Sequence, residues 1–234
     1  MLARMRSFWA AALALAKREV VLLSILLVAA GGILGFLRVV TELGDDRSAA
    51  FDRAVLLALR NPADITDPLG PEWLEQTALQ ITALGSTTVL TIVTVIVVAW
   101  LLLVRQLGAA AFVTIAVVGG AALSNLVKYS FARVRPELVP HIDLVSGNSF
   151  PSGHALSSAV VYLTLGTLLT RLRPERGHKI FLLSVATILT LLIGITRVYL
   201  GVHWPTNVLA GWCLGATWAM LCWAAALWMQ RRRK

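Results

Sequence analysis

The sequence is poor in charged residues. Of its 234 residues only 14% are Asp, Glu, Lys or Arg, whereas 58% are hydrophobic. A soluble globular domain has about a quarter charged residues and about half apolar ones. The scarcity of charge, together with apolar residues gathered in long blocks, argues against a soluble fold and favours a membrane protein. The length fits one domain that covers residues 1–234.

Cysteine is almost absent. The two cysteines, Cys213 and Cys222, stand in the same apolar block. Nine residues of helix would turn them to roughly opposite faces at about 100° per residue, which places them badly for a disulfide. We interpret them as two buried thiols that do not pair, and they give no information on the redox compartment.

Acidic residues are scarcer than basic ones, and the net charge is +9. A basic protein can bind nucleic acid, but here the basic residues stand in short segments between apolar blocks and in the C-terminal run 231–234. This distribution is typical of cytoplasmic membrane loops. No segment offers the basic face on a soluble fold that nucleic-acid binding requires, so we exclude nucleic acid as a partner.

Six apolar blocks are long enough to cross a bilayer as helices, which takes about 20 residues each. The blocks are residues 20–40, 86–104, 109–127, 153–170, 180–199 and 206–228. They lack the alternating pattern of barrel strands, and only helices and closed barrels satisfy the backbone inside lipid. The sequence therefore predicts an all-α membrane protein with six transmembrane helices. In the first block, Gly31, Gly32 and Gly35 would allow close helix packing.

The charges between the blocks predict the orientation of the chain. If the N-terminus is inside, the cytoplasmic segments hold 13 basic residues and two acids, and the outer segments hold eight basic residues and ten acids. By the positive-inside rule, both termini are cytoplasmic. Residues 1–18 resemble a signal peptide at first sight, but Lys17, Arg18 and Glu19 separate their short apolar stretch from a full-length span. We interpret 1–18 as a cytoplasmic, amphipathic lead-in.

The outer segment 41–85 is acidic and predicts two short helices. Phe51, Val55, Leu56 and Leu59 recur at helical spacing, with Asp52, Arg53 and Arg60 elsewhere, and Pro71 suits the start of a second helix. Both helices are expected to lie on the membrane surface. Two roles stay open for them: a plain surface cap, or a lid or lipid gate over a site.

Three polar clusters fall on the outer side in this orientation. The first is KYSFARVRP, residues 128–136. Lys128 and Arg135 are seven residues apart, about two helical turns, and would share a face if the helix continued. Pro136 disfavours helix at Arg135, so the helix is expected to end there. Taken alone, the pair is also explained as cations that extend to the membrane boundary.

The second cluster is SFPSGH, residues 149–154, at the start of the fourth block. Pro151 suits the first helical position and Ser149 a position near the cap. A helix that starts here presents unpaired backbone N–H groups around Ser152 and Gly153, and such a helix start binds phosphate. His154 then lies at the rim of the pocket. The alternative is a simple helix cap beside an interfacial histidine.

The third cluster is TRVYLGVHWPTN, residues 196–207, between the last two blocks. Arg197 ends one helix, and His203 precedes Trp204 and Pro205, which predict another helix start. Asn207 is then in the first turn, four residues after His203 and within hydrogen-bond reach of its imidazole. The alternatives are an arginine at the membrane boundary, an interfacial turn and a helix-end amide.

Each alternative is reasonable for its own cluster. The separate alternatives do not explain why three Lys or Arg residues, two histidines and a helix start gather at one membrane face. Charged groups near spans are costly and tend to be functional. Lys128, Arg135 and Arg197 can bind the non-bridging oxygens of a phosphate, and Ser152 and the backbone add donors. The histidines supply a nucleophile and an acid for displacement at phosphorus.

The clusters resemble the three signatures of the type-2 phosphatidic acid phosphatase superfamily, KxxxxxxRP, PSGH and SRxxxxxHxxxD, and the spacing agrees within each. The resemblance implies an enzyme of the inner (cytoplasmic) membrane that hydrolyses lipid phosphates at the outer face, without metal or other cofactor. Its substrate would be a lipid such as undecaprenyl pyrophosphate, phosphatidylglycerol phosphate, phosphatidic acid or a lipid A phosphate.

The resemblance also implies residue roles. His203 would attack phosphorus and form a phosphohistidine, and His154 would protonate the leaving oxygen and later activate water. The phosphoryl oxygens would be held by Lys128, Arg135, Ser152, Gly153 and Arg197.

Two positions depart from the signatures. Thr196 replaces the motif serine and keeps its hydroxyl, but Asn207 stands where the family has the aspartate that orients the nucleophilic histidine. In serine proteases the equivalent Asp→Asn change lowers kcat by about 10⁴. We therefore expect this chain to be impaired, either as an engineered change or as a natural variant. A lipid phosphotransferase using the same site and a non-catalytic lipid-phosphate binder or transporter stay open as alternatives, and the sequence gives no oligomeric state.

Overall fold

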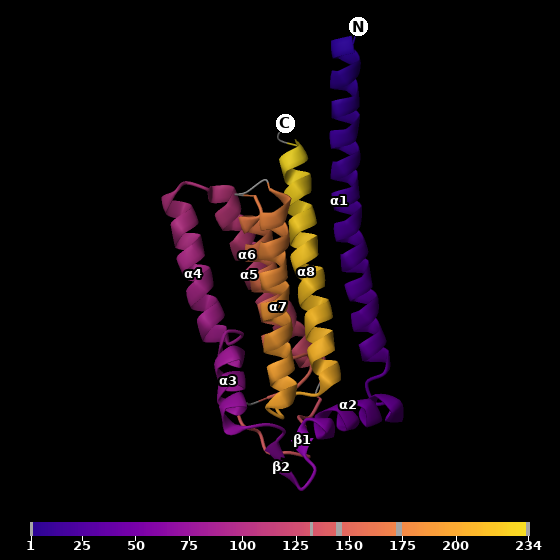
Figure 1. Ribbon diagram of the computed structural model, residues 1–234, viewed down its shortest axis with the longest axis vertical. Coiled ribbons are helices and arrows are strands. Elements are labelled where there is room, and N and C mark those ends of the chain that lie inside the picture. Colours follow the sequence, from indigo (N-terminus) through magenta and orange to yellow (C-terminus); the bar gives the residue numbers. More distant parts are fainter. Residues whose placement is uncertain (1, 132, 144–146, 172–174, 233–234) are drawn as a thin grey trace.

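A computed structural model of the chain describes residues 2–131, 133–143, 147–171 and 175–232. Six long helices form a bundle (Figure 1). They are α1 (Leu2–Thr41), α4 (Thr87–Leu103), α5 (Leu107–Ser130), α6 (Gly153–Leu169), α7 (Arg176–Tyr199) and α8 (Pro205–Arg232). All six predicted blocks are confirmed as helices. The lead-in 1–18 and the first span form one helix, α1, which begins at Leu2. The amphipathic character predicted for the lead-in depends on side chains that lie outside the described residues.

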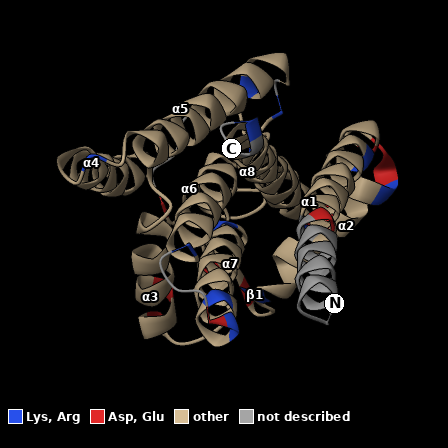
Figure 2. Ribbon diagram, turned by 90° about the horizontal axis from the view of Figure 1, so that it is seen from above, with Lys and Arg blue, Asp and Glu red and all other residues tan. Residues whose placement is uncertain are grey.

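Not all six helices meet the length of a membrane span. By length and composition, α1 (over Leu22–Thr41), α5, α7 and α8 can cross a membrane, and α4 joins them as a fifth if it is taken with the short helix before it, from which it is bent by 45°. Helix α6 is apolar but has only 17 residues. It packs against α5, α7 and α8 in the middle of the bundle (Figure 2). Six spans therefore stay a prediction.

The segment between α1 and α4 caps one end of the bundle. It contains α2 (Asp46–Ala58), β1 (Arg60–Asn61), β2 (Asp64–Pro68) and α3 (Glu72–Ala83). Figure 1 shows this cap at the end opposite the two chain ends. Both predicted short helices are present, whereas their position on a membrane surface stays a prediction. The antiparallel β1–β2 hairpin was not expected from an all-α sequence pattern.

The face that α2 buries differs from the prediction. Phe51, expected on the apolar face, is 49% exposed, whereas Asp52 is 1% exposed. Arg60, just after α2, is 3% exposed. The helix is thus turned so that a carboxylate faces the protein together with Leu56, one turn further on. The hydrogen-bond partners available to Asp52 explain this orientation, as described below.

Glycines in α1 let this helix approach α8 closely. On the α1 side, a Cβ at Gly32 would lie 2.2 Å from Thr217 Oγ1 and one at Gly35 would lie 2.9 Å from Cys213 Sγ, whereas Gly31 has nothing within 4 Å. The predicted close packing is thus confirmed for two of the three glycines. Both cysteines are free thiols as expected, but they are only half-buried, so the burial expected from the sequence was wrong.

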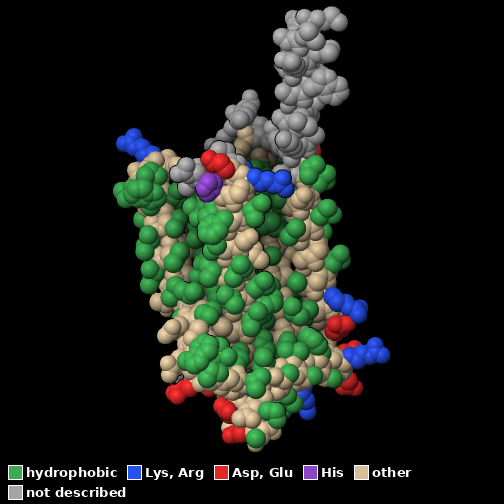
Figure 3. Space-filling model, viewed as in Figure 1, with side chains coloured by type: hydrophobic (Ala, Val, Ile, Leu, Met, Phe, Trp, Pro, Cys, Tyr) green, Lys and Arg blue, Asp and Glu red, His purple; other side chains and the backbone are tan. Residues whose placement is uncertain are grey.

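The sides of the bundle are apolar. Figure 3 shows hydrophobic side chains over the sides of the molecule and charged side chains gathered towards its ends. Large residues on these sides are strongly exposed, for example Leu27 at 72%, Ile96 at 63% and Leu103 at 78%. Such a continuous apolar surface is unfavourable in water and suits a bilayer.

Candidate phosphate-binding active site

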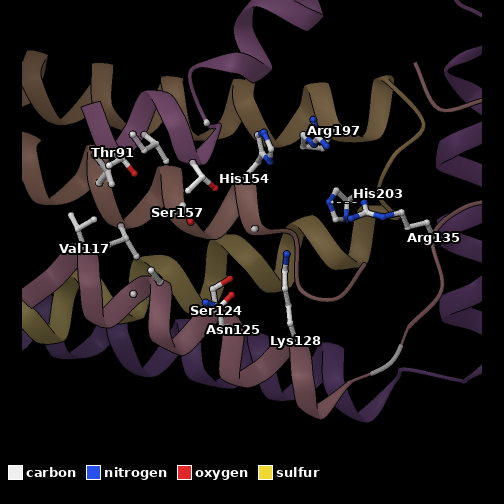
Figure 4. A pocket seen from close by; sticks show the side chains of 18 residues that line it. Thr91, Val117, Ser124, Asn125, Lys128, Arg135, His154, Ser157, Arg197 and His203 are labelled. Carbon is white, nitrogen blue, oxygen red and sulfur yellow. Dashed lines mark hydrogen bonds between the residues drawn. The ribbon is translucent and has the colours of Figure 1, made fainter. Parts of the chain in front are cut away.

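One cavity of about 430 Å³ lies between α4, α5 and α6 and reaches the end of α7 and the α7–α8 loop. Figure 4 shows Lys128, His154, Arg197, His203 and Arg135 towards one end of this cavity. Its lining continues away from them along α4, α5 and α6 with polar and then apolar side chains. The three polar clusters, which are far apart in the sequence, thus meet at a single cavity.

Six of the eight predicted site residues line the cavity. They are Lys128, Arg135, Gly153, His154, Arg197 and His203. The other two, Ser152 and Asn207, are fully buried and do not line it. They lie behind the cavity wall, where the backbone N–H of Ser152 donates to the carbonyl oxygen of Asn207 at 3.0 Å and so links α6 to α8.

Arg135 reaches the cavity from a loop. Helix α5 ends at Ser130, five residues before Arg135, so the helix ends earlier than the sequence suggested. Arg135 Nη1 donates to the carbonyl oxygen of Val202 at 2.9 Å and lies 3.3 Å from His203 Nε2 (Figure 4). A guanidinium can only donate, so this contact requires a lone pair on Nε2 and places the imidazole proton on Nδ1.

The start of α6 differs in detail from the prediction. The helix begins at Gly153, and Ser152 is its N-cap, with the hydroxyl accepting from Ala155 N at 3.5 Å. The expectation that Pro151 occupies the first helical position was wrong, because Ser152 provides the better cap one residue later. The helix start still faces the cavity through Gly153 and His154. A Cβ at Gly153 would lie only 3.1 Å from Lys128 Nζ, so glycine leaves room for this amine.

Arg197 lies in the last turn of α7, as predicted, and is 1% exposed. Its Nη1 donates to Thr82 Oγ1 at 3.1 Å and to the carboxylate of Asp143. Its Nε is buried without a hydrogen-bond partner among the described residues. Asp143 was not recognised from the sequence, since it stands in the α5–α6 loop outside any motif.

Asn207 makes a different contact from the one expected. Its Oδ1 accepts a hydrogen bond from Arg133 Nη1 rather than from His203. Within the described chain, Asn207 Nδ2 and His203 Nδ1 are both buried without a partner. Helix α8 does begin at Pro205, and Asn207 does lie in its first turn, as predicted. The difference arises because Arg133, the first of the two arginines of KYSFARVRP, donates to the amide oxygen.

The cavity carries an excess of positive charge. Burial, followed by the positive charges of Arg135, Arg197 and Lys128, holds the pKa of His203 well below its usual range. His203 is therefore neutral at physiological pH, and a neutral imidazole is the nucleophilic form. A buried cluster of cations beside a helix start attracts an anion with several oxygens, such as a phosphate.

The chain is similar to known membrane phosphatases. Residues 106–232 match the PAP2 superfamily. The chain is 34% identical over 144 residues to phosphatidylglycerophosphatase B of Bacillus subtilis, covering 61% of this chain and 70% of that protein. It is 37% identical over 99 residues to undecaprenyl-diphosphatase of Sulfolobus acidocaldarius, but this match covers only 40% of this chain and 44% of that protein.

A solved structure is similar over nearly the whole chain. The crystal structure of a transmembrane PAP2-type phosphatidylglycerolphosphate phosphatase from Bacillus subtilis superposes with a TM-score of 0.74 at 28% identity. The superposition covers 88% of this chain and 97% of that one. The similarity therefore includes the first helices, which precede the residues matched by the family.

Proposed function

Because the chain belongs to the PAP2 superfamily, we propose that it is an integral membrane enzyme that hydrolyses a phosphate or pyrophosphate monoester of a lipid. The observation that carries the proposal is the meeting of Lys128, Arg135, Arg197, His154 and His203 at one cavity. The similarity to lipid phosphatases supports the same class of substrate. We place the site at the outer face of the inner membrane with both termini in the cytoplasm, which the distribution of basic residues supports.

The first chemical step is a displacement at phosphorus. The Nε2 lone pair of His203 forms a bond to phosphorus while the bond from phosphorus to the lipid oxygen breaks. His154 gives its proton to the departing oxygen. Arg135 Nη1 lies 3.3 Å from the attacking nitrogen, so it is placed to bind a phosphoryl oxygen at the same time.

The second step is hydrolysis of the phosphohistidine. His154 takes a proton from water, the water oxygen bonds to phosphorus, and the bond from phosphorus to His203 breaks to release phosphate. Lys128 and the Nε–H of Arg197, which has no partner among the described residues, are donors for the phosphoryl oxygens in both steps. Ser152 contributes by capping α6 and so fixing His154, since its side chain is buried away from the cavity.

Asn207 supports a second candidate function, a non-catalytic lipid-phosphate binder. Asparagine brings no negative charge to stabilise a positively charged His203, and its oxygen is already bonded to Arg133. The binder hypothesis predicts tight binding without turnover. A phosphotransferase would use the same residues and pass the phosphoryl group to another lipid instead of water.

The test is phosphate release in detergent from a panel of lipid phosphates, measured for this chain and for Asn207→Asp. The panel contains phosphatidylglycerophosphate, undecaprenyl diphosphate, phosphatidic acid and a lipid A phosphate. We expect Asn207→Asp to turn over faster by a factor of up to about 10⁴, because a carboxylate can orient and stabilise His203. His203→Gln in the Asn207→Asp background serves as the control and should abolish release.

Each other outcome excludes one part of the proposal. Equal rates for this chain and for Asn207→Asp would show that position 207 does not limit turnover. If neither protein releases phosphate from any lipid, hydrolysis is the wrong reaction. Transfer of the phosphoryl group to an added lipid acceptor, or binding without turnover, would then identify which alternative holds.

A further inference from the structure

Asp52, in the cap helix α2, is a buried carboxylate with contacts to the first turn of α8. It is 1% exposed. Its Oδ1 accepts from the backbone N–H of Thr206 at 2.9 Å, and its Oδ2 accepts from the Thr206 hydroxyl at 2.6 Å and from Arg133 Nη2 at 2.7 Å. Asp52 thus holds both Arg133 and the helix turn that carries Asn207. It lies outside the three sequence signatures and outside the residues matched by the family.

Arg133 transmits this contact to Asn207. Its Nη1 donates to Thr206 Oγ1 at 2.7 Å and to Asn207 Oδ1. Because a guanidinium can only donate, the amide oxygen of Asn207 must face Arg133, and the amide nitrogen must face away. Asp52 forms an ion pair with Arg133 at 2.7 Å between Oδ2 and Nη2. Without this ion pair, Arg133 would be held at this place only by Thr206 Oγ1 and Asn207 Oδ1 and by the Trp204 ring, and the amide orientation would be less firmly fixed.

The direction of the amide matters for His203. Its Nε2 accepts from Arg135, so the ring proton is on Nδ1 and requires an acceptor. The amide oxygen of Asn207 has a second lone pair that can accept the Nδ1–H of His203. The amide nitrogen could not accept it, because the amide nitrogen is itself a donor. In the structure His203 Nδ1 and Asn207 Nδ2 have no partners in the described chain. Catalytic hydrogen bonds are often incomplete before substrate binds and form in the complex.

We propose that Asp52 is a positioning residue that acts through Arg133 to fix the Asn207 amide, so that its oxygen serves as the acceptor for His203. The Asp52–Arg133 pair gives an asparagine site the acceptor that the family obtains from aspartate. This inference rests on the proposed phosphatase function and goes beyond it. It also gives the cap helix a defined role as part of the support of the nucleophile.

The proposal predicts that position 52 and position 207 are coupled. A carboxylate at 207 has two acceptor oxygens, so one can bind Arg133 while the other faces His203 and no amide needs to be oriented. Asp52→Asn should therefore lower kcat about tenfold or more in this chain, yet less than about twofold in the Asn207→Asp background. In that double variant the cluster keeps one carboxylate and one arginine, with the negative charge moved next to His203.

The experiment is this double-mutant cycle, measured as kcat and KM for phosphate release. Asp46→Asn is the matched control, because Asp46 is an exposed carboxylate on the same helix. Thermal unfolding in detergent is recorded for all variants. If Asp52 only anchored α2, its loss would lower activity equally in both backgrounds, and that result would overturn the proposal. Unchanged kcat in this chain would overturn it as well.

A readout that needs no activity separates this proposal from the proposed function. If no variant hydrolyses any lipid, NMR of the ¹⁵N-histidine-labelled protein with inorganic phosphate still reports whether the Nδ1–H of His203 is hydrogen-bonded. Arg135 holds the Nδ1–H tautomer in both proteins, and we expect the Nδ1 proton signal to lie downfield, as that of a hydrogen-bonded proton, in this chain but not in Asp52→Asn. The same Nδ1 proton signal in both proteins would reject the positioning role whether or not the protein is a phosphatase.

Discussion

At the scale of single residues, His203 is surrounded by positive charge and cut off from water. It is 2% exposed, and the nearby charges that act on it come from Arg135, Arg197 and Lys128. Protonation would add a further positive charge to this group without solvent to stabilise it. The same arrangement that suits the binding of a phosphate therefore keeps the proposed nucleophile neutral.

This environment predicts a specific pH dependence. In the folded protein His203 should stay neutral well below pH 6.5, the usual pKa of histidine, and titrate only in more acidic solution. The unfolded chain takes up this proton near its ordinary pKa, so the free energy of unfolding should fall as the pH drops below that value. Histidine NMR titration of the folded protein in detergent is the measurement, and a His203 signal that titrates near pH 6.5 would contradict the prediction.

The residues of the site were only partly predictable from the sequence. Motif spacing found the side chains that line the cavity, because a helix start and a conspicuous cation or histidine can each be recognised locally. Asp52 and Arg133 were not found, since their contact joins residues 81 positions apart and depends on how α2 docks. An acidic residue four positions before buried Leu56 was the available signal, but the apolar spacing alone assigns it to the solvent-facing side.

At the scale of elements, α6 and α8 approach so closely that their contact depends on glycine. A Cβ at Gly211 would lie 2.7 Å from the carbonyl oxygen of Ser152, and one at Gly215 would lie 2.5 Å from that of Leu156. These two glycines are four residues apart and form the small-residue pattern that allows membrane helices to pack backbone to backbone. The helices they join carry His154 and Asn207, so the packing sets the distance between parts of the site.

Gly215→Val should therefore disturb both stability and activity. The larger side chain would push α8 away from α6 and cost about 1–3 kcal/mol, as overpacking of a close contact usually does. Thermal unfolding in detergent measures the stability, and phosphate release in the Asn207→Asp background measures the effect on the site. Gly31→Val is the control, because no atom lies within 4 Å of a Cβ there. Equal effects of the two substitutions would show that the close approach is unimportant.

Helix positions were more predictable than helix ends and small sheets. Apolar blocks gave all six long helices, since a long run of apolar residues has few other solutions in lipid. The start of α6 differed by one residue from the prediction, because Ser152 caps the helix and Pro151 stays outside it. The strands of the β1–β2 hairpin have only two and five residues, and they lack the alternating apolar pattern by which a strand is predicted.

At the scale of the whole molecule, the cap lies at one end of the bundle with the last turn of α7 and the start of α8, and the chain ends lie at the other (Figure 1). Arg197 stands in that last turn of α7, so the proposed site is at the cap end. The start of α7, where the basic residues Arg176 and Lys179 stand, is at the end with the termini. The structure thus separates the two groups of loops that the charge count had assigned to opposite sides of the membrane.

The orientation can be tested by labelling single cysteines from one side of the membrane. The background is Cys213→Ser and Cys222→Ser, and the two probes are Ala63→Cys in the cap hairpin and Gly177→Cys at the start of α7, both at exposed positions. If basic segments stay inside, a membrane-impermeant maleimide added to intact spheroplasts should label the Ala63 probe and reach the Gly177 probe only after the membrane is opened. The reverse pattern would place the cap and the site in the cytoplasm, and the substrate would then have to be a lipid phosphate of the inner leaflet. Labelling of both probes in intact cells would mean that the bundle does not keep a single orientation.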